Sequence, residues 1–156
     1  GVNDRSIGIE LDSPGHRPDA PHYPDAQIEA LLGLLAGIRS RWRIRAGRVV
    51  AHSDVAPSRK VDPGEAFPWA RLASAGHAIK VSAPSTAPPF DRTCFDDALV
   101  RAGYGVPAEA GAYADLVRAF HRRHRPDEVA APADGVSLAL AEAFARAVED
   151  DRARMA

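Results

Sequence analysis

The chain has 156 residues, a hydrophobic fraction of 46% and a formal net charge of -1, which suits one moderate globular domain or two small ones. Because positive and negative side chains nearly balance, no overall field would draw the protein to nucleic acid or to an anionic membrane. The sequence has no apolar run of the roughly 20 residues that cross a bilayer, and its first residues have no signal-peptide core.

The first predicted element is a buried strand over residues 6–11, in which apolar residues alternate with Gly8 and Glu10. This alternation places Glu10 on the face opposite the apolar side chains. Because the strand begins so early and the chain lacks an initiator Met, we expect that upstream residues are missing. After a loop rich in turn-forming residues, residues 24–42 predict a long helix with one apolar stripe that continues to Trp42.

A second predicted strand, residues 49–51, is rich in β-branched side chains and would deliver His52 at its end. Residues 53–63 contain prolines and no periodicity, which indicates an ordered loop. A brief helix is expected around Trp69. The segment 83–91 is typical of a linker, because its prolines stiffen the chain and its small residues bury little surface.

Beyond this linker, three short amphipathic patterns indicate a small three-helix domain over residues 92–152, separate from a first domain over residues 1–82. Such a bundle is near the lower size limit for independent stability, so packing against the first domain would assist it. The patterns cover residues 95–102, which end at Gly103, residues 113–124 and residues 137–150.

A basic run, residues 121–125, raises the question of nucleic-acid binding. We interpret it instead as a solvated helix end, where cations interact favourably with the helix dipole. Cys94, the single cysteine, is expected to be a partly buried small apolar residue and cannot form an internal disulfide.

Four side chains have the chemistry of a hydrolase site. His52 and Asp62 carry groups that both suit zinc, and a loop that starts at a strand end can return the second ligand to the first. Lys60 would lie on the same side as Asp62 in an extended segment, where it could stabilise negative charge on a carbonyl oxygen. Glu10 could be the base for a zinc-bound water. From residue types alone, a cap and a surface charge are the commoner explanation of His52 and Asp62.

Residues 3–11 and 52–64, with Phe67-Pro68-Trp69 behind them, resemble signature segments of the zinc-dependent N-acetylmuramoyl-L-alanine amidases, a family that includes the peptidoglycan recognition proteins. The resemblance extends over residues 1–82. It implies an α/β fold with a mixed sheet flanked by helices, and a zinc ion held by two histidines and one Asp or Cys.

The resemblance also implies a role for each candidate. His52 matches the second zinc histidine and Asp62 the last zinc ligand, while Glu10 and Lys60 match the catalytic Glu and Lys. The implied reaction is hydrolysis of the amide between N-acetylmuramic acid and L-alanine in peptidoglycan or muropeptides. Its products belong to cell-wall degradation or recycling.

One zinc ligand of the family has no counterpart here, because it lies upstream of the segment that begins at Asn3. His16, His22 and His77 are available, but His16 and His22 fall in a loop that is expected to contact substrate. We therefore take His16 and Trp69 as candidate substrate contacts, with core packing as the alternative for Trp69. The chain as given would bind zinc weakly or not at all.

Residues 99–104, 117–126 and 133–137 resemble landmarks of the three-helix peptidoglycan-binding domain, with Phe120 in its core. A wall-binding module favours the cell envelope or periplasm over the cytoplasm, with peptidoglycan or a muropeptide as the partner. We also expect a monomer that does not bind nucleic acid. The alternative function is a non-catalytic peptidoglycan-binding protein, or an inactive fragment, that lacks the first zinc histidine.

Overall fold

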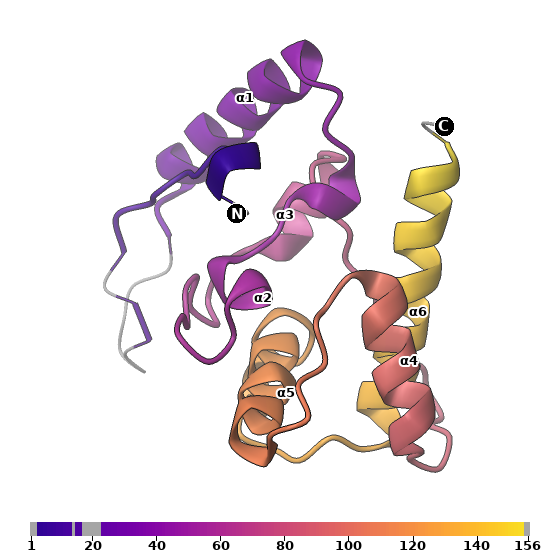
Figure 1. Ribbon diagram of the computed structural model, residues 1–156. Helices are drawn as coiled ribbons and strands as arrows, with labels where there is room; N and C mark the ends of the chain where they lie inside the picture. Colours follow the sequence, from indigo (N-terminus) through magenta and orange to yellow (C-terminus); the bar gives the residue numbers. More distant parts are fainter. Residues whose placement is uncertain (1–2, 14, 17–22, 155–156) are drawn as a thin grey trace.

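The computed structural model describes residues 3–13, 15–16 and 23–154, and in these ranges every regular element is a helix (Figure 1). Helix α1 forms one end of the molecule, and helices α4, α5 and α6 form the other (Figure 1). The elements in chain order are η1 (Asn3–Arg5), α1 (Asp25–Arg41), η2 (Ala46–Arg48), α2 (His52–Val55), α3 (Trp69–Ser74), α4 (Arg92–Ala102), α5 (Ala110–His124), η3 (Pro126–Glu128) and α6 (Gly135–Ala153).

The described residues contain no sheet, so the expected α/β fold with a mixed sheet was wrong for this structure. Residues 6–13 are irregular, and Ile7 is 52% exposed although we expected it in a buried strand. Residues 49–51 form no strand either, and Val50 is 49% exposed. A strand needs a neighbour that pairs with its backbone N–H and C=O groups, and neither segment has such a neighbour within the described ranges.

The long N-terminal helix and the short helix at Trp69 are confirmed as α1 and α3. Leu31 and Leu35 are buried on α1, and they pack in one cluster with Phe67, Trp69 and Leu72. Phe67 lies edge-on to Trp69, with ring centroids 4.8 Å apart. This small core holds α1 against the segment that carries the candidate site.

Trp42 departs from the expected apolar stripe, because it is 62% exposed. Helix α1 ends at Arg41, and Trp42 has an extended backbone (φ -117°, ψ 115°). The change from helical to extended backbone breaks the angular spacing on which the stripe was based. Trp42 is therefore a surface residue in this structure, and core packing does not explain it.

The three C-terminal helices are confirmed, and their ends follow from local sequence. The Asp91 side chain accepts a hydrogen bond from the backbone N–H of Cys94 at 2.9 Å and caps α4, which ends at the left-handed Gly103 (φ 105°). The Asp134 side chain caps α6 by accepting the N–H of Ser137 at 2.9 Å. Cys94 itself is exposed on the first turn of α4, so its expected partial burial was wrong.

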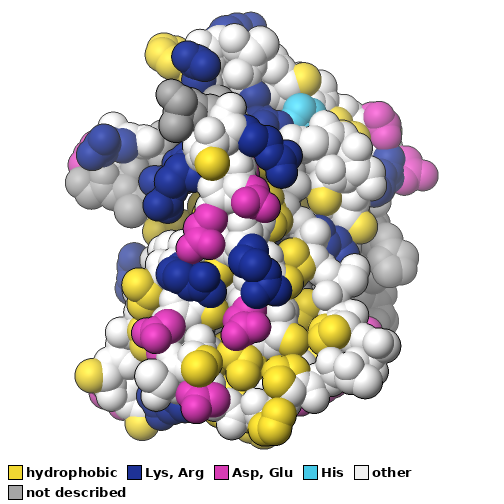
Figure 2. Space-filling model, turned by 90° about the vertical axis from the view of Figure 1, so that its right-hand side faces the viewer, with side chains coloured by type: hydrophobic (Ala, Val, Ile, Leu, Met, Phe, Trp, Pro, Cys, Tyr) yellow, Lys and Arg dark blue, Asp and Glu magenta, His cyan; other side chains and the backbone are white. Residues whose placement is uncertain are grey.

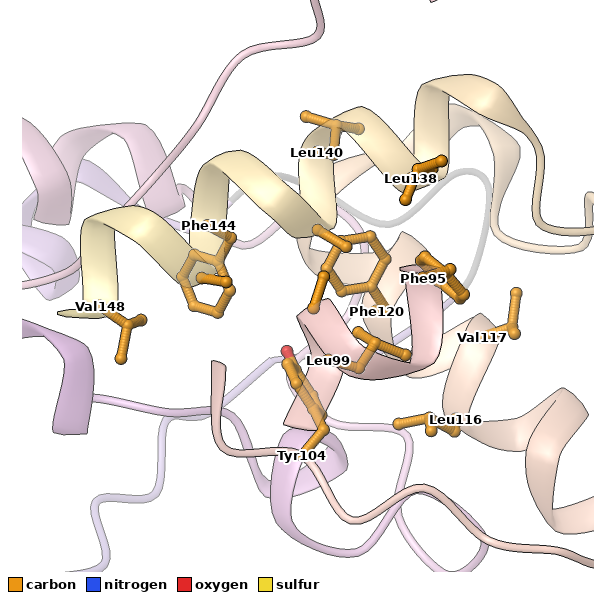
Figure 3. Close-up of a cluster of buried hydrophobic side chains, with 13 residues drawn as sticks. Phe95, Leu99, Tyr104, Leu116, Val117, Phe120, Leu138, Leu140, Phe144 and Val148 are labelled. Atoms are coloured by element: carbon orange, nitrogen blue, oxygen red, sulfur yellow. The ribbon is translucent and has the colours of Figure 1, made fainter. Parts of the chain in front are cut away.

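Figure 3 shows the core of this bundle, in which Phe95 of α4, Phe120 of α5 and Phe144 of α6 are buried with Tyr104 and several aliphatic side chains. Phe120 has no exposed surface, and its ring centroid lies 5.8 Å from that of Phe95 and 6.1 Å from that of Tyr104. Both neighbours meet it in edge-to-face arrangements, which aromatic pairs favour. Burial of these rings is the main source of stability in the bundle.

The linker segment 83–91 is exposed along its length, yet it packs against the bundle. The Phe90 ring centroid lies 5.8 Å from that of Phe95 on α4. A Cβ atom at Gly135, where α6 begins, would lie 1.8 Å from the carbonyl oxygen of Pro88. Only glycine permits this approach of two backbones. The linker is thus packed against the start of α6.

The surface that carries α4 and α6 has Lys or Arg and Asp or Glu side chains of both signs interspersed (Figure 2). This pattern agrees with the near-zero net charge. Among the described residues, none of the helices combines the length and the apolar character that a membrane span requires.

The basic run at the end of α5 is buried, so its interpretation as a solvated helix end was wrong. His121 has no exposed surface, and Arg123 and His124 are 4% and 7% exposed. The His121 Nε2 atom lies 2.8 Å from the Ser137 Oγ atom on α6. The run therefore packs inside the molecule, where each cation must meet a carboxylate, a carbonyl group or an aromatic ring.

His124 is buried between two aromatic rings, with ring centroids 4.5 Å from Phe120 and 4.6 Å from Phe144. Neither of its ring nitrogens has a hydrogen-bond partner among the described residues. Burial, and then the positive charge of Arg123, hold the pKa of His124 well below its ordinary value. The folded protein thus keeps His124 neutral at a pH where the unfolded chain binds a proton.

We expect the free energy of unfolding to fall as the pH drops below about 6.5, by up to about 1.4 kcal/mol per pH unit for His124. The folded-state pKa is depressed, so this loss continues until the pH reaches that lower value. Urea unfolding of the wild type and His124→Leu between pH 7 and pH 5 measures it. The variant should show the shallower slope, and parallel slopes would contradict the prediction.

Candidate functional site

The structure brings together the two residues that were predicted as metal ligands. The Nδ1 atom of His52 lies 3.2 Å from the Oδ2 atom of Asp62. Their side chains are 49% and 58% exposed, so both are open to solvent. A backbone hydrogen bond also joins the two ends of the loop between them, because the N–H of Ser53 donates to the carbonyl oxygen of Asp62 at 3.0 Å.

Local sequence explains this return of the chain. His52 is the first residue of the single-turn helix α2, and the N–H of Ala56 closes that turn on the carbonyl oxygen of His52 at 3.0 Å. The N–H of Lys60 then donates to the carbonyl oxygen of Ala56, also at 3.0 Å. Two successive turns therefore reverse the chain direction and carry Asp62 back to His52. The expected loop over residues 53–63 is ordered, but its first part is helical.

The donor chemistry fits two positions of a zinc site. Imidazole nitrogen and carboxylate oxygen are common zinc ligands, and two ligands of one tetrahedral zinc lie about 3.3 Å apart for bonds of about 2.0 to 2.1 Å. The observed separation of 3.2 Å between His52 and Asp62 matches that spacing. Within the described ranges, no group of three or more His, Cys, Asp or Glu side chains could hold a metal ion. The spacing of the pair fits two ligands and does not by itself make a complete coordination shell.

The two predicted catalytic residues are less closely defined. Glu10 is exposed in the irregular segment 6–13, and among the described residues no hydrogen bond joins it to His52 or Asp62. Lys60 is partly buried in the loop between the two candidate ligands. Their assignment as base and oxyanion stabiliser stays a prediction.

His16 lies against the far side of the same loop. Its Nδ1 atom is 2.8 Å from the Oε2 atom of Glu65, three residues after Asp62. The backbones also approach closely there, because a Cβ atom at Gly64 would lie 3.2 Å from the carbonyl oxygen of Gly15. His16 thus borders the candidate site, whereas His22 lies outside the described residues. His77 contacts a different part of the chain: its Nδ1 atom lies 2.9 Å from the Nη1 atom of Arg39.

Trp69, the other candidate substrate contact, is buried. Its ring is 7% exposed, packs edge-on against Phe67 and is covered by the Arg123 guanidinium at 3.9 Å from the ring centroid. This burial favours the core-packing alternative. A stacking role for a sugar would need an open ring face, which Arg123 occupies.

Sequence reasoning missed the residues that support the pair from behind. Asp54, in the same turn as His52, accepts hydrogen bonds from the N–H of Ala51 and from the Tyr104 hydroxyl, each at 2.8 Å. Arg123 of α5 donates to the Oδ2 atom of Asp54 at 2.7 Å, and these two side chains are 3% and 5% exposed. Burial and the Asp54 charge raise the pKa of Tyr104 well above its ordinary value, which keeps its hydroxyl a donor.

Glu65 was also missed. It lies between His16 and Arg122, whose Nε atom donates to the Oε1 atom of Glu65 at 3.1 Å. Burial alone would raise the pKa of Glu65, but hydrogen bonds from its own backbone N–H, from His16 and from Arg122 bring the pKa below its ordinary value. A sequence signal existed in the adjacent arginines of the basic run, but nothing in the sequence indicated which carboxylates they meet.

Comparison with known proteins relates the segment that carries His52 and Asp62 to a known family. Residues 1–65 match the model of the N-acetylmuramoyl-L-alanine amidase family. Over 162 aligned positions the chain is 38% identical to the N-acetylmuramoyl-L-alanine amidase AmiD of Escherichia coli, and the match covers 92% of this chain and 58% of AmiD. The chain thus spans less than two thirds of that relative.

Solved structures agree with this relationship. The structure of AmiD from E. coli in complex with anhydro-N-acetylmuramic acid-L-Ala-D-gamma-Glu-L-Lys superposes with a TM-score of 0.83 and 34% identity, covering 94% of this chain and 63% of AmiD. AmpDh3 from Pseudomonas aeruginosa, in complex with anhydromuramic pentapeptide, has a TM-score of 0.76 and 31% identity, covering 90% and 61%. The 1,6-anhydro-N-acetylmuramyl-L-alanine amidase AmpD of Enterobacter cloacae is 45% identical over 70 residues, which cover 45% of this chain and 35% of AmpD.

Proposed function

We propose that the chain carries the His52 and Asp62 half of a zinc site that hydrolyses the amide between N-acetylmuramic acid and L-alanine. The observation that supports the proposal is the 3.2 Å separation of the two donors in the segment that matches the amidases. AmiD and AmpDh3 were solved with anhydromuropeptides, so we propose a muropeptide or peptidoglycan substrate. Such a substrate belongs to the cell envelope, where we place the protein as a monomer.

In this proposal, His52 and Asp62 hold zinc, and other donors from solvent, substrate or residues outside the described ranges complete its shell. Zinc, when bound, polarises the scissile carbonyl group and acidifies water. Glu10 takes a proton from the attacking water and passes it to the leaving amine. Lys60 places its ammonium group beside the carbonyl oxygen, where negative charge develops.

Zinc binding tests the ligand pair. We expect His52→Ala to weaken zinc binding at least about tenfold, because a direct ligand contributes more than its outer-shell neighbours. Competition against a chromophoric chelator measures the dissociation constant in the full chain. His77→Ala is the matched control, since His77 contacts Arg39 and should leave zinc binding unchanged. Equal effects of the two substitutions, or no zinc binding by the wild type, would contradict the assignment.

Hydrolysis is a separate measurement. Release of the peptide from an anhydromuramyl-L-alanyl peptide should require zinc and should fall about 10² to 10⁴-fold in Glu10→Gln. The same variant should keep its zinc affinity, because Glu10 is not proposed as a ligand. An active Glu10→Gln variant would exclude Glu10 as the base.

A non-catalytic wall-binding protein is the second candidate, and a groove on the bundle favours it. The groove has a volume of about 390 Å³ and lies between α5 and the segment 130–133. Tyr113 lines it, with the Arg92 guanidinium 3.8 Å from the ring centroid. Sedimentation with purified peptidoglycan separates the candidates, because binding that His52→Ala leaves unaltered, without hydrolysis, supports the wall-binding module alone.

A further inference from the structure

Helix α5 of the C-terminal bundle reaches both sides of the candidate site through two adjacent arginines. Arg123 contacts Asp54 in the first half of the chain, and Arg122 contacts Glu65, which follows Asp62 by three residues. Figure 1 shows α2 facing α5, in agreement with the contacts between these helices. The buried end of α5 is therefore the connection between the bundle and the site.

The contact on the His52 side is a closed network. Asp54 lies two residues after His52 in the single turn of α2, and its carboxylate holds the N–H of Ala51 in front of that turn. Arg123 and Tyr104, both from the bundle, hold the same carboxylate. The Arg123 guanidinium also donates to the carbonyl oxygens of Val49 at 3.4 Å and Ile79 at 3.3 Å. The backbone on either side of His52 is thereby fixed to α5.

The contact on the Asp62 side is more open. Arg122 is 10% exposed and its partner Glu65 is 32% exposed. Glu65 follows Asp62 by three residues and also binds His16, so one carboxylate joins the end of the site loop to α5 and to residue 16. The two candidate ligands are thus held on opposite sides by consecutive residues of one helix.

We propose that Arg122 and Arg123 are positioning residues that set the separation of His52 and Asp62, acting through Glu65 and Asp54. The bundle then serves the candidate site as a clamp, in addition to any wall binding. The proposal rests on the proposed function only in taking the His52 and Asp62 pair as the site. A rigid pair binds a cation more tightly, because the ion need not order its ligands.

The test compares Arg122→Gln and Arg123→Met with the wild type in the full chain. The first readout is hydrogen exchange of the Ser53 amide without metal, because that amide bonds to the carbonyl oxygen of Asp62. The second readout is the zinc dissociation constant. Each substitution should accelerate Ser53 exchange and weaken zinc binding, in each case by about tenfold. In Arg122→Gln, whose ion pair is the more open of the two, amides in the bundle core, such as those of Phe120 and Phe144, should exchange as before.

Arg118→Met is the matched control, since Arg118 lies on the same helix with its side chain 48% exposed and bonded to Asp115. It should change neither readout. Equal acceleration at Ser53 and in the bundle core of Arg122→Gln would overturn the proposal in favour of a general structural role, as would unchanged Ser53 exchange in both variants. If Arg123→Met does not fold, Arg122→Gln decides. A wild type that binds no zinc but whose Ser53 exchange responds would overturn the proposed function and leave the clamp standing.

Discussion

Replacing Asp54 by alanine is expected to lower the free energy of unfolding by about 3 to 5 kcal/mol. The substitution removes the carboxylate that faces Arg123 in a place where the two side chains are 5% and 3% exposed. The guanidinium would keep its positive charge in the interior, because arginine does not deprotonate in proteins. The Tyr104 hydroxyl and the Ala51 N–H would lose their acceptor as well.

Urea unfolding followed by circular dichroism measures this loss. Glu29→Ala is the control, since Glu29 pairs with Arg71 at the surface, where its side chain is 66% exposed, and such pairs contribute about 0 to 1 kcal/mol. The double variant Asp54→Ala/Arg123→Met should be more stable than the sum of the single losses predicts, because it removes both charges. A loss below about 1 kcal/mol for Asp54→Ala would show that the ion pair is not buried as described.

Phe120→Ala should destabilise the bundle by a similar amount, about 3 to 5 kcal/mol. Phe120 has no exposed surface and contacts rings from every side of the core, including Phe95, Tyr104 and His124. Its removal leaves a cavity that the surrounding aromatic rings cannot fill without leaving their own positions. Because α5 also carries Arg122 and Arg123, the candidate site should lose its order in the same transition.

The measurement is again urea unfolding, with two probes. Near-ultraviolet circular dichroism in the indole band reports on Trp42 and Trp69, both in the first half of the chain, and far-ultraviolet circular dichroism reports on all helices. Val100→Ala is the control, since Val100 lies on α4 with 57% of its surface exposed and should change stability by less than about 0.5 kcal/mol. Two separate transitions in Phe120→Ala would contradict the coupling of the halves.

The helices could be predicted because their signals are local. Helix α4 has its cap at Asp91 and its left-handed glycine at Gly103, and α6 has its cap at Asp134, all within a few residues of the helix ends. The apolar spacing of α1 was read correctly up to Ile38, and it failed at Trp42, where the backbone leaves the helical region.

The two strand predictions were wrong for a different physical reason. An alternating segment such as residues 6–11 has strand propensity, but strand formation depends on a partner, and the sequence of the segment does not contain that information. The prediction that the basic run, residues 121–125, is a solvated helix end was wrong for the same reason. Arg123 finds Asp54 at a separation of 69 positions in the chain, and no local pattern specifies such a pair.

In the candidate site, too, local features could be predicted and long-range contacts could not. The pairing of His52 with Asp62 follows from a short loop and could be predicted, together with the proximity of His16 to that loop. The support of this pair by Asp54, Glu65 and α5 could not be predicted, because it depends on contacts between segments that lie far apart in the sequence.

The packing of Pro88 against Gly135 has a consequence for protein engineering. Because Pro88 is packed against the start of α6, only the part of the linker before Pro88 can act as a tether, and this shortens the reach of the bundle from the rest of the chain. A chimera that exchanges residues 92–153 for an unrelated wall-targeting module would therefore need more than a compatible junction. The new module would have to supply counterparts of Arg122 and Arg123, of the Tyr104 hydroxyl and of Gly135. Without them, it would not pack against the first half of the chain in the same orientation.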